Sequence, residues 1–212
     1  MSGKQKRIEL VVASRNYKKF KEIKEILREF KLKITSLRDY PQAPRIVENG
    51  RTFEENAIKK ARLIARFTGK LTLGEDSGLE VAALGGKPGI YSSRFSGRDK
   101  NDVKNNLKLL RLLADLPIKE RKARYVCSVA LFDKHGLLGV TEGYCQGIIA
   151  FQLRGSSGFG YDPLFIIPKY KKTFAQLGPR IKHKISHRFR ALSMARQIIK
   201  KYSGIPNGLT KI

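Results

Sequence analysis

Two adjacent carboxylates, Glu75 and Asp76, follow the apolar run 71–73 in a chain that has 44 Lys and Arg but only 18 Asp and Glu. A third acid, Glu48, precedes a predicted helix. Mg²⁺ takes one or two protein carboxylates and leaves its other positions to water and substrate phosphates. Asp76 or Glu75 could also accept a proton from an attacking water. These acids are therefore a candidate metal and catalytic centre, and the alternative is a set of surface acids paired with lysines.

A second polar segment lies between a predicted strand and a predicted helix. It consists of Ser14, Arg15, Asn16, Tyr17, Lys18 and Lys19. Free N–H groups and the helix dipole favour an anion such as a phosphate at a helix start, and Lys19 adds positive charge. The alternative is a capped helix with surface lysines. The segment is not a Walker A loop, because GxxxxGK[ST] occurs nowhere in the chain.

A third set combines aromatic and basic residues near the end of the chain. It consists of Phe159, Gly160, Tyr161, Asp162, Lys182, His187 and Arg188. Phe159 or Tyr161 could stack on a flat ring. Lys182 and Arg188 are donors only, so they favour an acceptor such as a purine 6-oxo group over the amino group of adenine. The alternative is an aromatic turn packed in the core beside a basic helix start.

The first half of the chain alternates predicted strands and helices, and these elements must position the polar segments. Apolar spacing predicts strands at 8–13, 32–35 and 71–73, and helices at 16–30 and from the capping box at 52–55 to about Phe67. A further helix is predicted at 101–113, with Val103, Leu107, Leu110 and Leu113 on one face.

The second half begins with a predicted β-hairpin. The runs 124–132 and 137–146 are joined by a turn at 133–136, and residues 148–151 could continue the second run beyond Gly147. A strand at 164–167 and a closing helix with apolar residues from Ile185 to Tyr202 complete the pattern. The predicted fold is α/β, with a mixed sheet and flanking helices. No linker is evident, so residues 1–212 are expected to form a single domain of two lobes.

The composition, with 41% apolar residues, is typical of a globular protein. No apolar run approaches the roughly 20 residues of a membrane helix. The first residues lack the apolar stretch of a secretory signal, and two cysteines are too few for a disulfide framework. We therefore expect a cytoplasmic protein without a membrane partner.

The net charge of +26 is unevenly distributed, since no Asp or Glu follows Asp162. Such asymmetry predicts anionic partners and leaves open a non-specific affinity for nucleic acid. The alternative is a solvated basic surface.

Five motifs in this order resemble the inosine triphosphate pyrophosphatase family, whose members hydrolyse non-standard purine nucleoside triphosphates such as ITP, dITP and XTP. The motifs are SxNxxK (14–19), Glu48 with TFEENAIKKA (52–61), GEDSGLEVAALGGKPGIYSSRFSG (74–97), GFGYDPLF (158–165) and KHKISHRFRAL (182–192). The resemblance covers nearly the whole chain. Glu75 stands where many relatives have Asp, which still supplies a carboxylate.

The resemblance implies roles for these residues. Ser14, Asn16 and Lys19, with Lys60, would hold the triphosphate, and Ser77 would touch the substrate beside the metal. Glu48 and Asp76 would bind Mg²⁺, with Asp76 also the proton acceptor and Glu75 a supporting acid. The aromatic and basic set would line the base pocket and read the 6-oxo purine.

Family members release the monophosphate and pyrophosphate, which cleanses the nucleotide pool. They are commonly homodimers with a long sheet and a central nucleotide-binding cleft between two lobes. Two other readings of the sequence remain: a basic nucleic-acid-binding protein without catalysis, and a pyrophosphatase for modified pyrimidine nucleotides.

Overall fold

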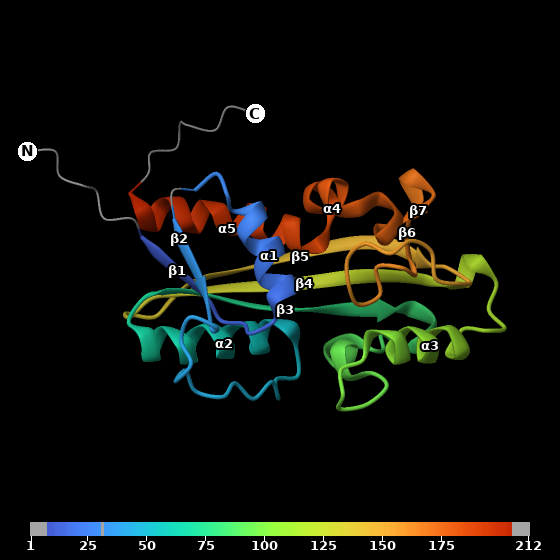
Figure 1. Ribbon diagram of the computed structural model, residues 1–212, viewed down its shortest axis with the longest axis horizontal. Coiled ribbons are helices and arrows are strands. Elements are labelled where there is room, and N and C mark those ends of the chain that lie inside the picture. Colours follow the sequence, from blue (N-terminus) through green and yellow to red (C-terminus); the bar gives the residue numbers. More distant parts are fainter. Residues whose placement is uncertain (1–7, 31, 205–212) are drawn as a thin grey trace, which may run out of the picture. The chain divides into compact units, whose positions relative to one another are not determined.

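A computed structural model describes residues 8–30 and 32–204. The first seven residues, for which no secretory signal is predicted, lie outside this part. The strands form a seven-stranded mixed sheet in the order β2-β1-β3-β4-β5-β6-β7 (Figure 1). The strands are β1 (Glu9–Val12), β2 (Lys33–Ser36), β3 (Leu71–Val81), β4 (Lys122–Phe132), β5 (Leu137–Ile149), β6 (Phe165–Ile167) and β7 (Lys172–Thr173). The α-helices are α1 (Tyr17–Ile26), α2 (Phe53–Thr68), α3 (Asp102–Leu112), α4 (Phe174–Ile185) and α5 (His187–Ser203).

β1 pairs in parallel with both β2 and β3, whereas β6 pairs antiparallel with β5 and β7. The predicted α/β class with a mixed sheet and flanking helices is therefore confirmed. None of the helices in the described part is long and apolar enough to span a membrane.

The chain divides into two compact units. The first contains Met1–Asp76, Ser128–Glu142 and Ala191–Ile212, and the second contains Ser77–Cys127 and Gly143–Arg190. The boundary between Asp76 and Ser77 falls inside β3, so one strand supplies residues to both units. Each unit has a hydrophobic core of its own.

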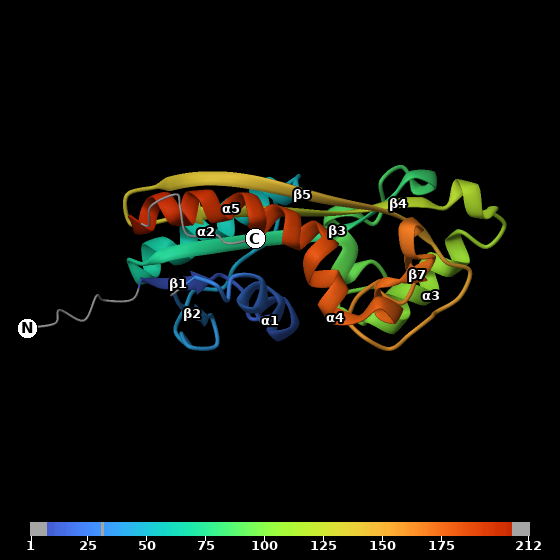
Figure 2. The same ribbon diagram turned by 90° about the horizontal axis from the view of Figure 1, so that it is seen from above.

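In the first unit, helices cover both faces of the sheet. α1 and α5 lie on one face and α2 on the other (Figures 1 and 2). Arg196 of α5 donates to the Ile26 carbonyl at the end of α1 (2.7 Å) and pairs with Glu29 (2.9 Å). α2 packs three alanines, at positions 57, 61 and 65, against Ala130 and Phe132 of β4. These small residues let helix and sheet approach closely.

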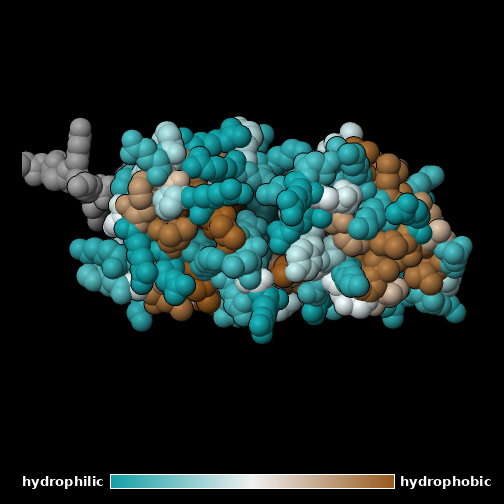
Figure 3. Space-filling model, turned by 90° about the horizontal axis from the view of Figure 1, so that it is seen from below, coloured by the Kyte–Doolittle hydropathy of each residue, from teal (hydrophilic) through white to brown (hydrophobic). Residues whose placement is uncertain are grey.

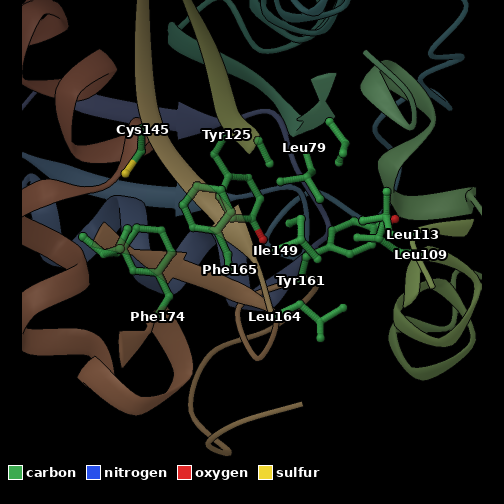
Figure 4. Packing of buried hydrophobic residues seen from close by; sticks show 13 residues of the cluster. Leu79, Leu109, Leu113, Tyr125, Cys145, Ile149, Tyr161, Leu164, Phe165 and Phe174 are labelled. Atoms are coloured by element: carbon green, nitrogen blue, oxygen red, sulfur yellow. The ribbon is translucent and has the colours of Figure 1, made fainter. Parts of the chain in front are cut away.

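In the second unit, α3 and α4 lie on opposite sides of the strands (Figure 1). Its core joins Leu109 and Leu113 to Tyr161 and Leu164, and continues to the aromatic rings of β4, β6 and α4 (Figure 4). The rings of Tyr125 and Phe165 have centroids 4.6 Å apart. This core anchors the segments that carry the aromatic and basic set.

Three predicted boundaries were wrong. The predicted strand 71–73 extends to Val81, so Glu75 and Asp76 lie within a strand and not at its end. The first helix ends at Ile26 and not at residue 30. The closing helix starts at His187, and α4, which the sequence did not predict, precedes it. Gly178 (φ 71°) and Pro179 interrupt the helical pattern of α4, which hides it from apolar spacing.

Only part of the predicted apolar stripe of α3 is buried: Leu113 belongs to the core and Leu110 packs against it. Val103 and Leu107 are 61% and 55% exposed, and hydrophobic side chains gather over α3 on the face seen in Figure 3. The buried face also contains two amides, Asn105 and Asn106, followed by Leu109.

Candidate functional site

Glu75 and Asp76 are buried within β3, with exposed fractions of 2% and 6%. Successive side chains of a strand point to opposite faces, and the two acids have partners on different helices. The Glu75 carboxylate pairs with Lys19 of α1 (Nζ–Oε2 2.8 Å), and the Asp76 carboxylate pairs with Lys60 of α2 (Nζ–Oδ1 2.8 Å). A buried carboxylate requires such partners.

The Lys60 ammonium joins two of the predicted acids. Its Nζ lies 2.8 Å from Asp76 Oδ1 and 3.0 Å from Glu48 Oε1, and it also donates to the Glu75 carbonyl (3.1 Å). Burial alone would lower the pKa of Lys60, but the charges of Asp76 and Glu48 outweigh burial, and the pKa is raised. Lys60 is therefore charged at neutral pH.

Asn56 is a member of this site that the sequence reasoning missed. Its Nδ2 donates to Asp76 Oδ2 (3.1 Å), and its Oδ1 accepts from the Gly50 N–H (2.8 Å). Asn56 and Lys60 are four residues apart and therefore share one face of α2. That spacing, within a motif already singled out, is the signal that could have found it.

Gly74 allows β3 to approach α2. A Cβ at this position would lie 2.1 Å from the Ala57 carbonyl oxygen and 2.6 Å from the Ala61 nitrogen. No side chain fits there, so Gly74 brings Asp76 within reach of Lys60.

The segment 14–19 forms the capped start of α1. Asn16 accepts from the Lys19 N–H (3.1 Å), and the Ser14 hydroxyl accepts from the Asn16 N–H (3.1 Å). Arg15 donates to the carbonyls of Leu37 (3.2 Å) and Ala43 (3.4 Å), outside the segment.

Other side chains of this segment differ in their surroundings. Tyr17 is 54% exposed, and its ring lies 5.1 Å from the Arg38 guanidinium. Lys18 is exposed, whereas Lys19 reaches Glu75. The structure therefore places Lys19 beside the acidic strand and directs Arg15 to the neighbouring loop.

In the second unit, Phe159 is the centre of the aromatic and basic set. The Lys182 ammonium lies 4.6 Å and the Arg188 guanidinium 5.7 Å from the centroid of its ring. Asp162 accepts from Lys182 Nζ (2.6 Å) and from the Phe159 N–H (2.9 Å). Phe159 is half-buried, whereas Asp162, Lys182 and Arg188 are buried. This arrangement offers a ring face flanked by two cations.

Tyr161 and His187 are packed in the core. Tyr161 is 3% exposed and lies close to Leu109 and Leu113 (Figure 4), and its hydroxyl donates to the Ser92 carbonyl (2.8 Å). Burial raises its pKa. The His187 ring stacks on Tyr125, with centroids 4.5 Å apart. Of the two rings proposed to stack on a base, Phe159 is therefore the accessible one.

Ser77 begins the second unit, directly after Asp76. Its hydroxyl accepts from the Arg188 guanidinium (3.0 Å). Ser77 and Arg188, a member of the aromatic and basic set, both belong to the second unit.

Glu48 and Asp76 could bind a hard cation whose other ligands are water and phosphate. Glu48 and Asp76 share one ammonium, and the Glu48 side chain is 35% exposed. Among the residues that the structure describes, no group of three His, Cys, Asp or Glu could hold a metal ion. Two carboxylates suffice for Mg²⁺ when water and phosphate complete its shell. The structure groups Glu48 with Asp76 and places Glu75 with Lys19.

Comparisons with known proteins agree with the motifs. A model of the Ham1 family matches residues 10–198. A dITP/XTP pyrophosphatase of Desulforamulus reducens is 46% identical over 194 residues, which are 92% of this chain and 96% of that protein. A solved HAM1 protein of Coxiella burnetii superposes with a TM-score of 0.82 at 38% identity, covering 92% of this chain and 99% of its own. A solved nucleoside-triphosphatase, also named dITP/XTP pyrophosphatase, from Mycobacterium abscessus has a TM-score of 0.71 at 40% identity, covering 89% of this chain and 97% of its own.

Proposed function

The chain belongs to the Ham1 family, and we propose that it hydrolyses non-standard purine nucleoside triphosphates (ITP, dITP and XTP) to the monophosphate and pyrophosphate. This reaction would remove such nucleotides from the pool. The observation that carries the proposal is the buried Lys60 ammonium shared by Asp76 and Glu48. It brings together an acid of β3, an acid of the loop before α2 and a cation of α2, and such groups can stabilise the charge that develops in phosphoanhydride hydrolysis.

We assign the triphosphate to the first unit. Lys19 and Lys60, with Ser14, Asn16 and the start of α1, would bind phosphate oxygens, and Arg15, Tyr17 and Lys18 flank them. Glu48 and Asp76 would hold Mg²⁺, with Glu75 as a supporting acid. When bound, the ion would neutralise phosphate charge and favour the departure of pyrophosphate.

Asp76 would accept the proton of the attacking water. Its second oxygen is held by Asn56 (3.1 Å), so the carboxylate keeps one orientation. Phosphate oxygens that approach Lys60 would compete with Asp76 for that ammonium, and this exchange would release a carboxylate oxygen for the water.

We assign the purine base to the second unit. The Phe159 ring would stack on the base. Lys182 and Arg188, which donate only, would favour the 6-oxo group and leave the adenine amino group unpaired. Asp162, Gly160 and Tyr161 shape the segment, and His187 supports it from the core. Ser77 would contact the substrate next to Asp76.

The test is pyrophosphate release from a panel of ITP, dITP, XTP, ATP and modified pyrimidine triphosphates, each with Mg²⁺ and with EDTA. We expect release from the 6-oxo purines with Mg²⁺ and its loss with EDTA. Equal rates for ITP and ATP would contradict the assignment of the base site. Faster release from a modified pyrimidine triphosphate would instead favour the alternative function, a pyrophosphatase for modified pyrimidine nucleotides.

The resemblance to the family also supports a proposal for the assembly and the location. We propose a homodimeric, cytoplasmic enzyme whose residues 1–212 act as a single two-lobed domain. Light scattering of the purified chain would test the dimer, and a monomeric mass at micromolar concentration would contradict it.

A further inference from the structure

Two side chains of α3 hydrogen-bond to the backbone N–H and carbonyl of Gly160. Asp102 Oδ2 accepts from the Gly160 N–H (2.9 Å), and Asn106 Nδ2 donates to the Gly160 carbonyl (2.9 Å). Asp102 and Asn106 are four residues apart, so they project from one face of the helix. One helix face therefore fixes both hydrogen-bonding groups of a single residue.

Gly160 lies between the residues assigned to base recognition. Phe159 precedes it, and Asp162, which holds both the Phe159 N–H and Lys182, follows two residues later. Gly158 (φ 86°) and Gly160 (φ 62°) have left-handed backbone conformations. The backbone here belongs to no helix or strand. One turn hydrogen bond, from the Asp162 N–H to the Phe159 carbonyl (3.3 Å), is supplemented by hydrogen bonds to side chains.

The surface of α3 supports a specific role for these polar residues. Asn106 is 4% exposed, whereas Leu107, the next residue, is 55% exposed. Burying an amide in place of a leucine costs free energy unless the amide is hydrogen-bonded. In α3 the hydrogen bond from the Asn106 amide to the Gly160 carbonyl offsets part of this cost.

We propose that Asp102 and Asn106 are positioning residues for base specificity: they hold Gly160 so that the Phe159 ring and the Asp162–Lys182 pair keep the spacing that a 6-oxo purine requires. This inference rests on the proposed function. The two residues touch the loop and not the substrate, so they affect recognition of the base more than the phosphate chemistry.

Asn105 provides a matched control. It lies on the same helix, is 2% exposed, and hydrogen-bonds to Ser96 (2.7 Å) and the Ser93 carbonyl (3.2 Å) instead of Gly160. An Asn105→Ala variant therefore loses buried hydrogen bonds of the same kind in the same helix. This control distinguishes the effect of a general loss of protein stability from the effect of a displaced Gly160.

The experiment measures kcat and KM for ITP and ATP, and the binding of inosine monophosphate by calorimetry. For Asn106→Ala we expect the KM for ITP and the Kd of the monophosphate to rise roughly three- to tenfold, which corresponds to the loss of about one hydrogen bond. We expect kcat to stay within about twofold, since the phosphate site is untouched. The ratio of ITP to ATP in kcat/KM should fall, whereas Asn105→Ala should lower the melting temperature and leave that ratio unchanged.

Asp102 supplies a second pair of variants should Asn106→Ala fold poorly. Asp102→Ala removes the acceptor for the Gly160 N–H, and Asp102→Asn retains an acceptor oxygen and should restore most of the ITP preference. The inference would be contradicted if the ITP to ATP ratio in kcat/KM were unchanged in Asn106→Ala and Asp102→Ala. It would also be contradicted if Asn105→Ala changed this ratio as much as they do. Either result would leave the proposed function standing. A wild-type protein inactive on every purine triphosphate overturns the proposed function, and the inference with it.

Discussion

At the scale of the residue, the Asp76 carboxylate has one oxygen on Lys60 and the other on Asn56. Both partners are donors from α2, so an amide in place of the carboxylate would lose the charge and the proton acceptor but retain most of the shape. We expect Asp76→Asn to lower kcat for ITP by at least about a hundredfold, the usual contribution of a general base. Steady-state pyrophosphate release measures this effect.

A matched control for Asp76 is Glu54→Gln, which changes an exposed acid in the first turn of α2. It removes the same charge from the molecule without touching Lys60. Full turnover by Asp76→Asn would contradict the assignment, whereas equal losses in both variants would point to a general effect of charge.

Glu9 gives the first unit a pH-dependent contribution to stability. Burial would raise its pKa, but hydrogen bonds from Tyr40 (2.5 Å), Lys70 and Lys33 lower the pKa from 4.5 to about 2. A folded-state pKa below the unfolded value stabilises the protein above pH 4.5, and this contribution is lost as the pH falls toward 2. We expect Glu9→Gln to cost about 2 kcal/mol at pH 7, after allowance for partial exposure.

Urea unfolding of the wild type and of Glu9→Gln at a series of pH values tests this expectation. The difference in free energy of unfolding should shrink below pH 4.5. Tyr40→Phe, which removes one donor, should show a smaller difference over the same range. A difference that does not depend on pH would contradict the role of the charge.

At the scale of the element, the contact between β3 and α2 depends on a residue without a side chain. Gly74→Ala would place a Cβ 2.1 Å from the Ala57 carbonyl and force the strand away from the helix. We expect a loss of about 2 kcal/mol or more, together with a fall in activity, because Asp76 would move from Lys60. Thermal unfolding and ITP turnover measure the two effects.

Gly69→Ala is the control for Gly74→Ala, because it replaces a glycine at the end of α2 that does not take part in the contact with β3. Gly69 ends α2 with φ 66°, and nothing lies within 4 Å of an added Cβ. The change should cost about 1 kcal/mol through backbone strain alone and leave the turnover of folded protein unchanged. Loss of activity in Gly69→Ala comparable to that in Gly74→Ala would argue against a specific contact.

The elements also show which features of the sequence were informative. Apolar periodicity located β1, α2 and the hairpin of β4 and β5, because those elements bury apolar side chains. It found only the first three residues of β3, where buried acids interrupt the apolar run. It located α3 but did not predict that Asn105 and Asn106 belong to its buried face. In both places the buried groups are polar and have partners distant in sequence, which a pattern of hydrophobicity does not contain.

The candidate site was predictable in its residue types and less so in its pairings. The motifs indicated Lys60, Glu48 and Asp76 as parts of a site, but no spacing predicted that one ammonium joins both acids. Tyr161 and Phe159 were equivalent in sequence, and only packing shows that Tyr161 belongs to the core. Tertiary contacts decided these points.

At the scale of the whole molecule, the net charge of +26 exceeds what a triphosphate site needs. The basic residues are spread over most elements, so the predicted affinity for nucleic acid should be weak and independent of base sequence. We expect a single-stranded RNA to bind with a Kd of roughly 10⁻⁴ to 10⁻⁶ M at physiological salt, and to dissociate as salt is raised. Fluorescence anisotropy over a salt series measures this.

The same salt series distinguishes the interpretation as an enzyme from the interpretation as a nucleic-acid-binding protein. Charge that is distributed over the surface does not depend on one carboxylate, so Asp76→Asn should bind RNA as the wild type does while losing ITP turnover. Excess RNA should leave ITP turnover unchanged at salt concentrations that prevent binding. Binding that prefers one sequence and persists at high salt, in a protein that releases no pyrophosphate, would instead establish the nucleic-acid-binding reading, because dedicated recognition requires contacts that counterions do not displace.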